Sequence, residues 1–183
     1  MKNLEKQINK IINLYHSKKK GGFRYSLLDD ALSNEDIFKG IEVLIKKKIT
    51  MGQITERFEY EFAKYLNVKH ALMVNSGSSA NLLAAFALVN PKKKNFLKPG
   101  DEFLIQALCW STSLWPLVQA GLKPKFIDVN KDTLNIDEIF FEKSLSKKTK
   151  AAMIVHVLGN SSNISKISKN LKKKKYIFNR RYM

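Results

Sequence analysis

The stretch Val74-Asn75-Ser76-Gly77-Ser78-Ser79-Ala80-Asn81 links a short apolar run, residues 71–74, to a helix-forming run, residues 80–88. A turn of this kind gathers backbone N–H groups at a helix N-terminus, where unpaired donors and the helix dipole favour an anion. Gly77 lets a ligand approach the backbone closely, and the serine hydroxyls can add hydrogen bonds. The stretch therefore predicts a phosphate-binding turn. The simpler interpretation is a helix capped by Ser78 or Ser79.

From Lys69 onward the sequence alternates short apolar runs with runs of helical periodicity. The expected strands are 70–74, 102–106, 124–129 and 151–158, and the expected helices between them lie near 80–90, 113–120 and 137–145. This alternation predicts an α/β protein, with three α/β/α layers around a mostly parallel sheet. Ligands of such sheets bind at the carboxyl ends of the strands, where residues 76–79 and 109–111 both fall.

Residues 1–50 are expected to form an N-terminal helical segment. Within residues 1–20 the apolar side chains recur at helical spacing between lysines, which predicts an amphipathic helix that packs on a partner surface rather than on a membrane. Ser33 is expected to cap a second helix, with Asp36 reaching back to it. A third helix is expected over about 55–66.

Size and composition favour a globular protein, with 183 residues of which 44% are hydrophobic. The longest apolar run, Leu82–Val89, is too short to cross a bilayer, and the N-terminus lacks the apolar core of a secretory signal. A single cysteine, Cys109, forms neither an internal disulfide nor a metal site. We therefore expect a cytoplasmic protein without a membrane or metal partner.

The formal net charge of +17 raises the alternative of a basic module that binds nucleic acid. Lysine supplies 29 of the 33 basic residues, however, and arginine, which reads bases and phosphates through a planar fork, supplies four. No acidic residue follows Glu142, whereas twelve basic residues lie between Lys143 and Arg181. Nucleic acid is therefore the less favoured partner, and most of the excess charge is interpreted as solvated lysine.

A second unusual segment, residues 109–113 (CWSTS), follows the expected strand 102–106. Its tryptophan, Trp110, could stack on a flat aromatic ligand near the phosphate-binding turn. The alternative is that Trp110 and Trp115 fill the core between a helix and the sheet.

Residues 52–159 resemble the DegT/DnrJ-type sugar-nucleotide aminotransferases, which use pyridoxal 5'-phosphate (PLP). The segments that match, in the family's order and spacing, are Phe58-Glu59, Phe62-Ala63, and residues 75–81, 97–102, 119–124, 126–129, 132–137 and 156–160. The resemblance implies the N-terminal part of the large domain of a PLP enzyme of fold type I. It also implies that Gly77 and Ser78 hold the cofactor phosphate, with Ser76 or Ser79 as helpers, and that Trp110 stacks on the pyridine ring.

The function implied by this resemblance is transfer of an amino group from an amino acid donor to a nucleotide-linked ketosugar, in polysaccharide or lipopolysaccharide synthesis. Complete relatives are typically homodimers. A related alternative is a PLP-dependent 3-dehydratase, in which histidine replaces the Schiff-base lysine. Residues 1–20, 75–83 and 90–96 resemble that branch, whereas Trp110 favours the aminotransferases. The residue that decides lies beyond Met183.

The sequence departs from the family at its C-terminal end. Residues 51–178 cover part of the large domain, and residues 179–183 form a basic tail where the family has an acidic pair that supplies the pyridinium-binding aspartate. None of the 29 lysines can be assigned as the Schiff-base lysine, so no catalytic residue is named. We expect a truncated or frameshifted product that does not transaminate alone. His156 is either a site residue or a core histidine that donates to a backbone carbonyl.

Overall fold

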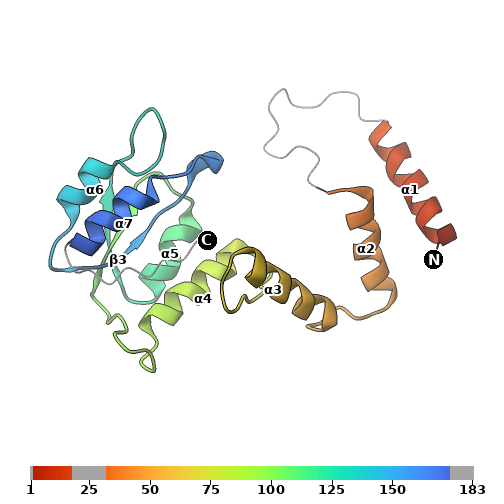
Figure 1. The fold of residues 1–183 in the computed structure, drawn as a ribbon, viewed down its shortest axis with the longest axis horizontal. Helices are drawn as coiled ribbons and strands as arrows, with labels where there is room; N and C mark the ends of the chain where they lie inside the picture. The colour runs from red at the N-terminus through yellow and green to blue at the C-terminus, as the bar shows by residue number, and fades with distance from the viewer. Residues whose placement is uncertain (1, 18–31, 174–183) are drawn as a thin grey trace. The chain divides into compact units, whose positions relative to one another are not determined.

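The computed structural model describes residues 2–17 and 32–173, drawn in colour in Figure 1. The chain divides into two compact units, Met1–Met73 and Val74–Met183, which are described separately. The basic tail 179–183 lies outside the described residues. The predicted boundary at residue 50 stays a prediction.

The first unit contains three helices, α1 (Lys2–Ser17), α2 (Asn34–Ile45) and α3 (Gln53–Tyr65). Helices α1 and α2 pack together, and Asn34 Nδ2 donates to Asn13 Oδ1 at 3.1 Å. The predicted cap of α2 is confirmed, because Ser33 Oγ accepts the Asp36 N–H at 3.2 Å while the Asp36 carboxylate accepts the Ser33 N–H at 2.9 Å. These reciprocal bonds pair two donors that a helix start otherwise leaves unsatisfied.

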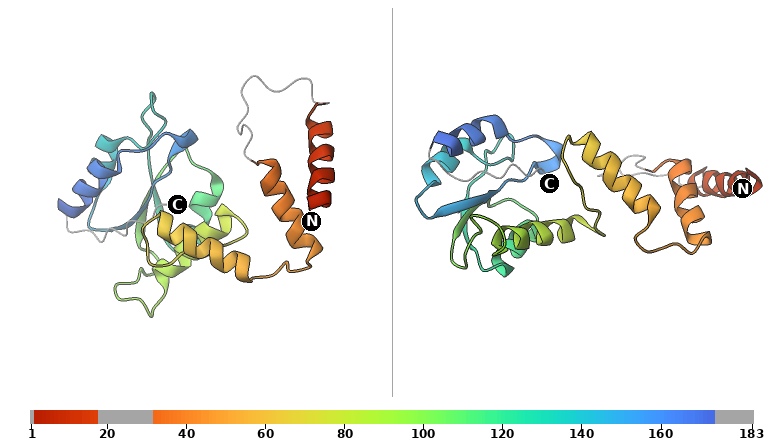
Figure 2. Two further views of the ribbon diagram at one scale, coloured as in Figure 1. Left: turned by 45° about the vertical axis from the view of Figure 1, so that its right-hand side comes forward. Right: turned by 60° about the horizontal axis from the view of Figure 1, so that its bottom comes forward.

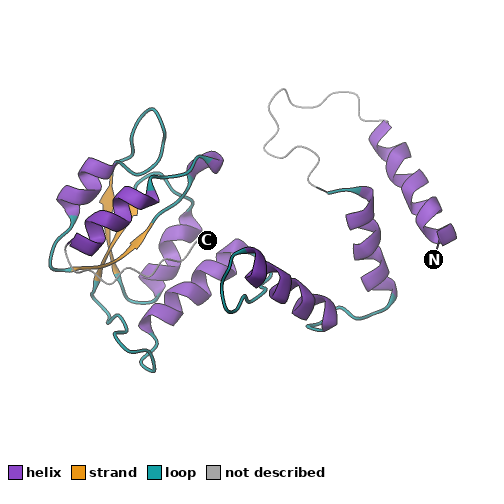
Figure 3. Ribbon diagram, viewed as in Figure 1, coloured by secondary structure: helices purple, strands orange, loops and turns teal. Residues whose placement is uncertain are grey.

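The second unit alternates helices and strands. In chain order its elements are α4 (Gly77–Val89), β1 (Glu102–Gln106), α5 (Ser111–Gln119), β2 (Lys123–Ile127), α6 (Glu138–Ser144), β3 (Thr149–Met153), the 3₁₀ helix η1 (Val157–Gly159) and α7 (Ile164–Lys173). The three strands form a parallel sheet in the order β2-β1-β3. Figure 3 draws the strands in orange.

The strand order explains why helices cover both faces of the sheet. The chain moves from β1 to β2 in one direction and then crosses back past β1 to β3 in the other. A right-handed crossover changes face when the direction reverses, so α5 and α6 lie on opposite faces. In the right-hand view of Figure 2, α4 and α5 lie below the sheet and α6 and α7 above it. The predicted α/β/α layering is confirmed.

The alternation of side chains along β1 divides the core into two clusters. Phe103 and Ile105, both fully buried, face the α4–α5 layer, and Leu104, also fully buried, faces the α6–α7 layer. The first cluster also contains Ala85, Leu117, Ala120 and Leu122, and the second contains Ile127, Ile136, Phe141, Leu145, Ile167 and Leu171. The continuous apolar run of β1 is typical of a central parallel strand, buried on both faces.

Two predicted strands are corrected by the structure. Residues 70–74 form no strand, because a strand needs a neighbour to pair with and the described strands pair only with one another. The strand predicted over 151–158 covers 149–153 instead. It ends early because the N–H of Val155 donates to the side chain of Gln106, and Leu158 then adopts a left-handed conformation with φ 53° inside η1.

Candidate functional site

The N-terminus of α4 holds the predicted phosphate-binding turn. The cap is Ser76, not Ser78 or Ser79: Ser76 Oγ accepts the Ser79 N–H at 3.2 Å and the Ser76 carbonyl accepts the Ala80 N–H at 3.0 Å. Ser76 is the cap because only the side chain of the residue just before the first helical turn can reach the backbone N–H three residues later, here that of Ser79. Within the described residues, the N–H groups of Gly77 and Ser78 have no acceptor, and both residues are exposed. Two unpaired donors at an exposed helix start fit an anion.

Gly77 leaves room in front of these donors. A Cβ built on Gly77 would meet no heavy atom within 4 Å, and the residue does not adopt a left-handed backbone conformation. The fold therefore does not require glycine at this position. What the missing side chain provides is open space beside the N–H groups, which is what a phosphate would need.

Trp110 lies in the loop that follows the carboxyl end of β1 and is the N-cap residue of α5. Its side chain is 75% exposed and that of Trp115 is 55% exposed, so neither tryptophan belongs to the two buried clusters. The alternative that both fill the core is therefore wrong. A large exposed aromatic ring at this edge of a parallel sheet leaves a face free for stacking.

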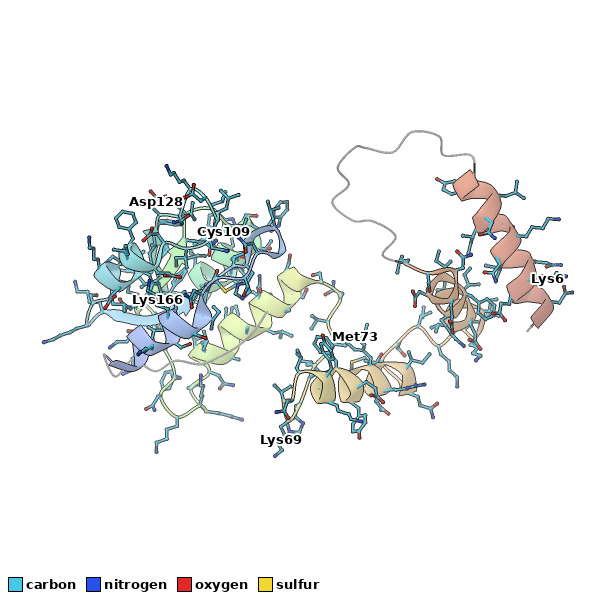
Figure 4. The ribbon with its side chains drawn as sticks, turned by 45° about the horizontal axis from the view of Figure 1, so that its top comes forward. Lys6, Lys69, Met73, Cys109, Asp128 and Lys166 are labelled. Atoms are coloured by element: carbon cyan, nitrogen blue, oxygen red, sulfur yellow. The ribbon has the colours of Figure 1, made fainter. Side chains whose placement is uncertain are left out.

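Cys109 and Asp128, labelled in Figure 4, follow the carboxyl ends of the neighbouring strands β1 and β2. Burial raises the pKa of the Cys109 thiol, so at neutral pH it stays protonated rather than becoming a nucleophilic thiolate. Within the described residues, no group of three or more histidine, cysteine or acidic side chains could hold a metal ion.

A side-chain hydrogen bond joins the phosphate-binding helix to the tryptophan loop. Asn81 Nδ2, in the first turns of α4, donates to the Thr112 carbonyl at 3.0 Å, across 31 residues of sequence. In a regular helix this carbonyl would accept the N–H of residue 116, which is a proline and has none. Pro116 thus leaves the Thr112 carbonyl without a helical N–H donor, and the Asn81 side chain supplies a donor in its place. This bond places the α4 N-terminus beside the start of α5.

Gln106 ends β1 and joins the two loops at the carboxyl edge of the sheet. Its side chain is fully buried, its Oε1 accepts the Val155 N–H at 3.1 Å and its Nε2 donates to the Leu108 carbonyl at 3.1 Å. The sequence analysis did not single out this residue. The available signal was a lone amide at the end of an apolar strand, FLIQ, where a buried polar group must find partners.

His156 begins the turn that follows β3. Its Nδ1 accepts the Ser162 N–H at 3.0 Å, which requires Nδ1 to be unprotonated and leaves the ring proton on Nε2. The expectation of a histidine that donates to a backbone carbonyl is therefore wrong for Nδ1. The ring is half-buried, and no catalytic role is assigned to it.

The model of the DegT/DnrJ/EryC1/StrS aminotransferase family matches residues 31–178. The chain belongs to this family. Membership accounts for the fold. The cofactor binding of Ser76, Gly77, Ser78 and Trp110 itself stays a prediction.

Among the family's curated members, the chain is 44% identical to GDP-4-keto-6-deoxy-D-mannose 3-dehydratase of Escherichia coli O55:H7, over 72% of this chain and 34% of the relative. It is 42% identical to the enzyme of that name from Yersinia pseudotuberculosis, over 69% of this chain and 32% of the relative. The identity to GDP-perosamine synthase of Vibrio cholerae is 34%, over 63% and 30%. The chain thus spans about a third of these relatives.

The fold matches solved structures of the family. The E. coli 3-dehydratase with bound hydrated PLP has a TM-score of 0.76 at 38% identity, over 86% of this chain and 40% of that chain. A Helicobacter pylori aminotransferase of pseudoaminic acid biosynthesis has a TM-score of 0.69 at 28% identity, over 83% and 39%. The family is PLP-dependent, as the sequence predicted, and PLP is the group bound in the E. coli structure.

Proposed function

We propose that this chain is the N-terminal portion of a PLP-dependent enzyme that acts on a nucleotide-linked ketosugar, and that it derives from the 3-dehydratase branch. The observation that carries this proposal is the 44% identity to the E. coli 3-dehydratase over 72% of the chain. The sequence analysis favoured the aminotransferase branch and kept the dehydratase as its alternative. The comparisons favour that alternative.

Each described residue of the site has a distinct part in binding the cofactor. The N–H groups of Gly77 and Ser78, with the α4 dipole, hold the phosphate, since both donors lack another acceptor in the described structure. Trp110 contacts the face of the ring. Asn81 keeps these two parts together through the Thr112 carbonyl. The cofactor, when bound, supplies an electron sink at the sugar.

The second candidate is an aminotransferase that loads its cofactor from an amino acid donor such as glutamate. It is favoured by the 34% identity to GDP-perosamine synthase and by 32% identity over 82% of this chain to a transaminase of Helicobacter pylori.

For either reaction we infer a cytoplasmic homodimer. Within the described residues no helix is long and apolar enough to cross a membrane.

Binding of PLP to the full chain tests the cofactor site. In a Trp115→Phe background, Trp110 is the remaining tryptophan, and titration with PLP should quench its fluorescence. Gly77→Val should abolish the quenching because its side chain fills the space beside the donors. Gly40→Val, in α2, is the matched control, since a Cβ there also meets no atom within 4 Å. Unquenched fluorescence in the parent, or equal quenching in Gly77→Val, would refute the site.

Two further measurements separate the reactions. Reading the downstream DNA in all three frames should reveal the strand with its aspartate and the block of the cofactor-binding lysine. Histidine at the lysine position supports the dehydratase, and lysine supports the aminotransferase. A basic nucleic-acid module predicts instead that the chain binds duplex DNA with an affinity that falls steeply with salt and does not depend on Trp110.

A further inference from the structure

Gln106 is a fully buried amide at the carboxyl end of the central strand β1. Burying an amide without partners is costly, so its two hydrogen bonds, from the Val155 N–H and to the Leu108 carbonyl, both 3.1 Å long, are needed where it lies. A leucine or valine at this position would leave the Val155 N–H and the Leu108 carbonyl without this side-chain partner. The amide therefore has a use beyond packing.

The two partners of Gln106 lie in segments that leave the same edge of the sheet toward helices on opposite faces. Leu108 comes two residues before Trp110, in the loop to α5, and Val155 comes directly before His156, in the segment that leads to α7. Backbone pairing between β1 and β3 ends at Ile105 and Met153. Beyond that point, the Gln106 side chain accepts the Val155 N–H and so links the end of β1 to the segment after β3.

We propose that Gln106 is a positioning residue that holds the Trp110 loop in register with the His156 segment and so sets the place of the Trp110 ring for the cofactor. This inference rests on the proposed function. In this role Gln106 touches neither cofactor nor substrate, and acts through the Leu108 carbonyl and the Val155 N–H. A separate hydrogen bond, from the Ser162 N–H to His156 Nδ1, leaves the ring proton of His156 on Nε2.

The fold does not depend on the two Gln106 hydrogen bonds alone. The Ala107 N–H donates to the Ile127 carbonyl at 2.8 Å, which ties the start of the loop to β2, and the Ser113 N–H donates to the Trp110 carbonyl at 2.9 Å. Loss of the Gln106 amide therefore loosens residues 108–110 between two anchored ends. We expect a folded chain with a more mobile Trp110.

The experiment uses the full chain with Trp115→Phe. The test variant is Gln106→Met, which keeps the length of the side chain but makes neither hydrogen bond. The control is Gln119→Met, at the exposed end of α5. Steady-state anisotropy of Trp110 without ligand should fall in Gln106→Met, and the PLP dissociation constant should rise about tenfold. Gln119→Met should change neither quantity. Far-UV circular dichroism and the urea midpoint report whether each variant is folded.

A Gln106→Glu variant keeps the inference testable if Gln106→Met does not fold. The protonated carboxyl can donate and accept as the amide does, the carboxylate can only accept, and burial raises the pKa of such a group. As the pH falls from about 8 to about 5, the anisotropy of this variant should rise to the parental value, while the parent stays constant. A space-filling role would give no such pH dependence.

The outcomes separate the two proposals. If the parent binds no PLP, the proposed function fails, and the anisotropy still decides whether Gln106 orders the loop. If the parent binds PLP and Gln106→Met matches it in anisotropy and affinity, the positioning role is overturned. Anisotropy of Gln106→Glu that does not change with pH would overturn it as well.

Discussion

The hydrogen bond between Asn81 and the Thr112 carbonyl leads to a quantitative prediction, because a proline creates the acceptor. Pro116 cannot donate to Thr112, so in Asn81→Ala that half-buried carbonyl loses its side-chain donor. An unsatisfied polar group of this kind costs about 1–3 kcal/mol. Alanine recovers about 0.6 kcal/mol of helix propensity over asparagine. The net expected loss of unfolding free energy is about 0.4–2.4 kcal/mol.

Pro116→Ala supplies the test of this reasoning. The new N–H at position 116 can donate to the Thr112 carbonyl in the regular helical pattern. The carbonyl therefore keeps a donor even when the Asn81 side chain is removed. In this background Asn81→Ala should cost about 1 kcal/mol less than in the parent, as a coupling in a double-mutant cycle. The cavity and propensity effects of Pro116→Ala itself cancel in the cycle.

Urea denaturation of the four proteins, followed by circular dichroism, measures the cycle. The midpoint of Asn81→Ala should fall and its m-value should stay unchanged, as expected when stability changes without a change in exposed surface. Equal losses in the two backgrounds would refute the argument that Pro116 opens the acceptor that Asn81 fills. Gln119→Ala, at an exposed site of α5, should leave the midpoint unchanged and serves as the control.

Three other predictions concern a helix cap, two glycines with positive φ and the lysines. Hydrogen bonds from the side chain and backbone of Ser33 lower the pKa of Asp36. The stability that these bonds contribute is present above the pKa of Asp36 in the unfolded chain and is lost as the pH falls through the lowered pKa of the folded chain. Carboxyl titration by NMR should show the pKa of Asp36 rising toward its normal value in Ser33→Ala. Gly121→Ala should lower the urea midpoint more than Gly100→Ala: both residues have positive φ, 83° and 89°, but only the Cβ at 121 meets Pro99 Cβ, at 3.2 Å. Borohydride treatment of the chain with PLP should trap no adduct on a defined lysine, as mass spectrometry of the digest can check.

Local patterns in the sequence were sufficient for the layers and for one helix cap. The continuous apolar run of β1 predicts a strand buried on both faces, and the Ser33–Asp36 spacing predicts the cap that the structure shows. Residues 70–74 carry the same apolar signal, yet they form no strand in the described structure. Strand formation depends on a neighbouring strand, which a local pattern cannot supply.

The sequence by itself predicted a phosphate-binding turn and a stacking ring, since a glycine-serine helix start and a tryptophan have the chemistry for those roles in any fold. The sequence also predicted that the two segments meet at the carboxyl ends of the strands, but only the tertiary structure decided which contacts join them. That placement depends on Asn81 reaching a carbonyl 31 residues away and on Gln106 bridging two loops. Two of these side-chain hydrogen bonds, Asn81 to the Thr112 carbonyl and the Val155 N–H to Gln106, join distant segments. Their geometry exists only after the strands have taken the order β2-β1-β3.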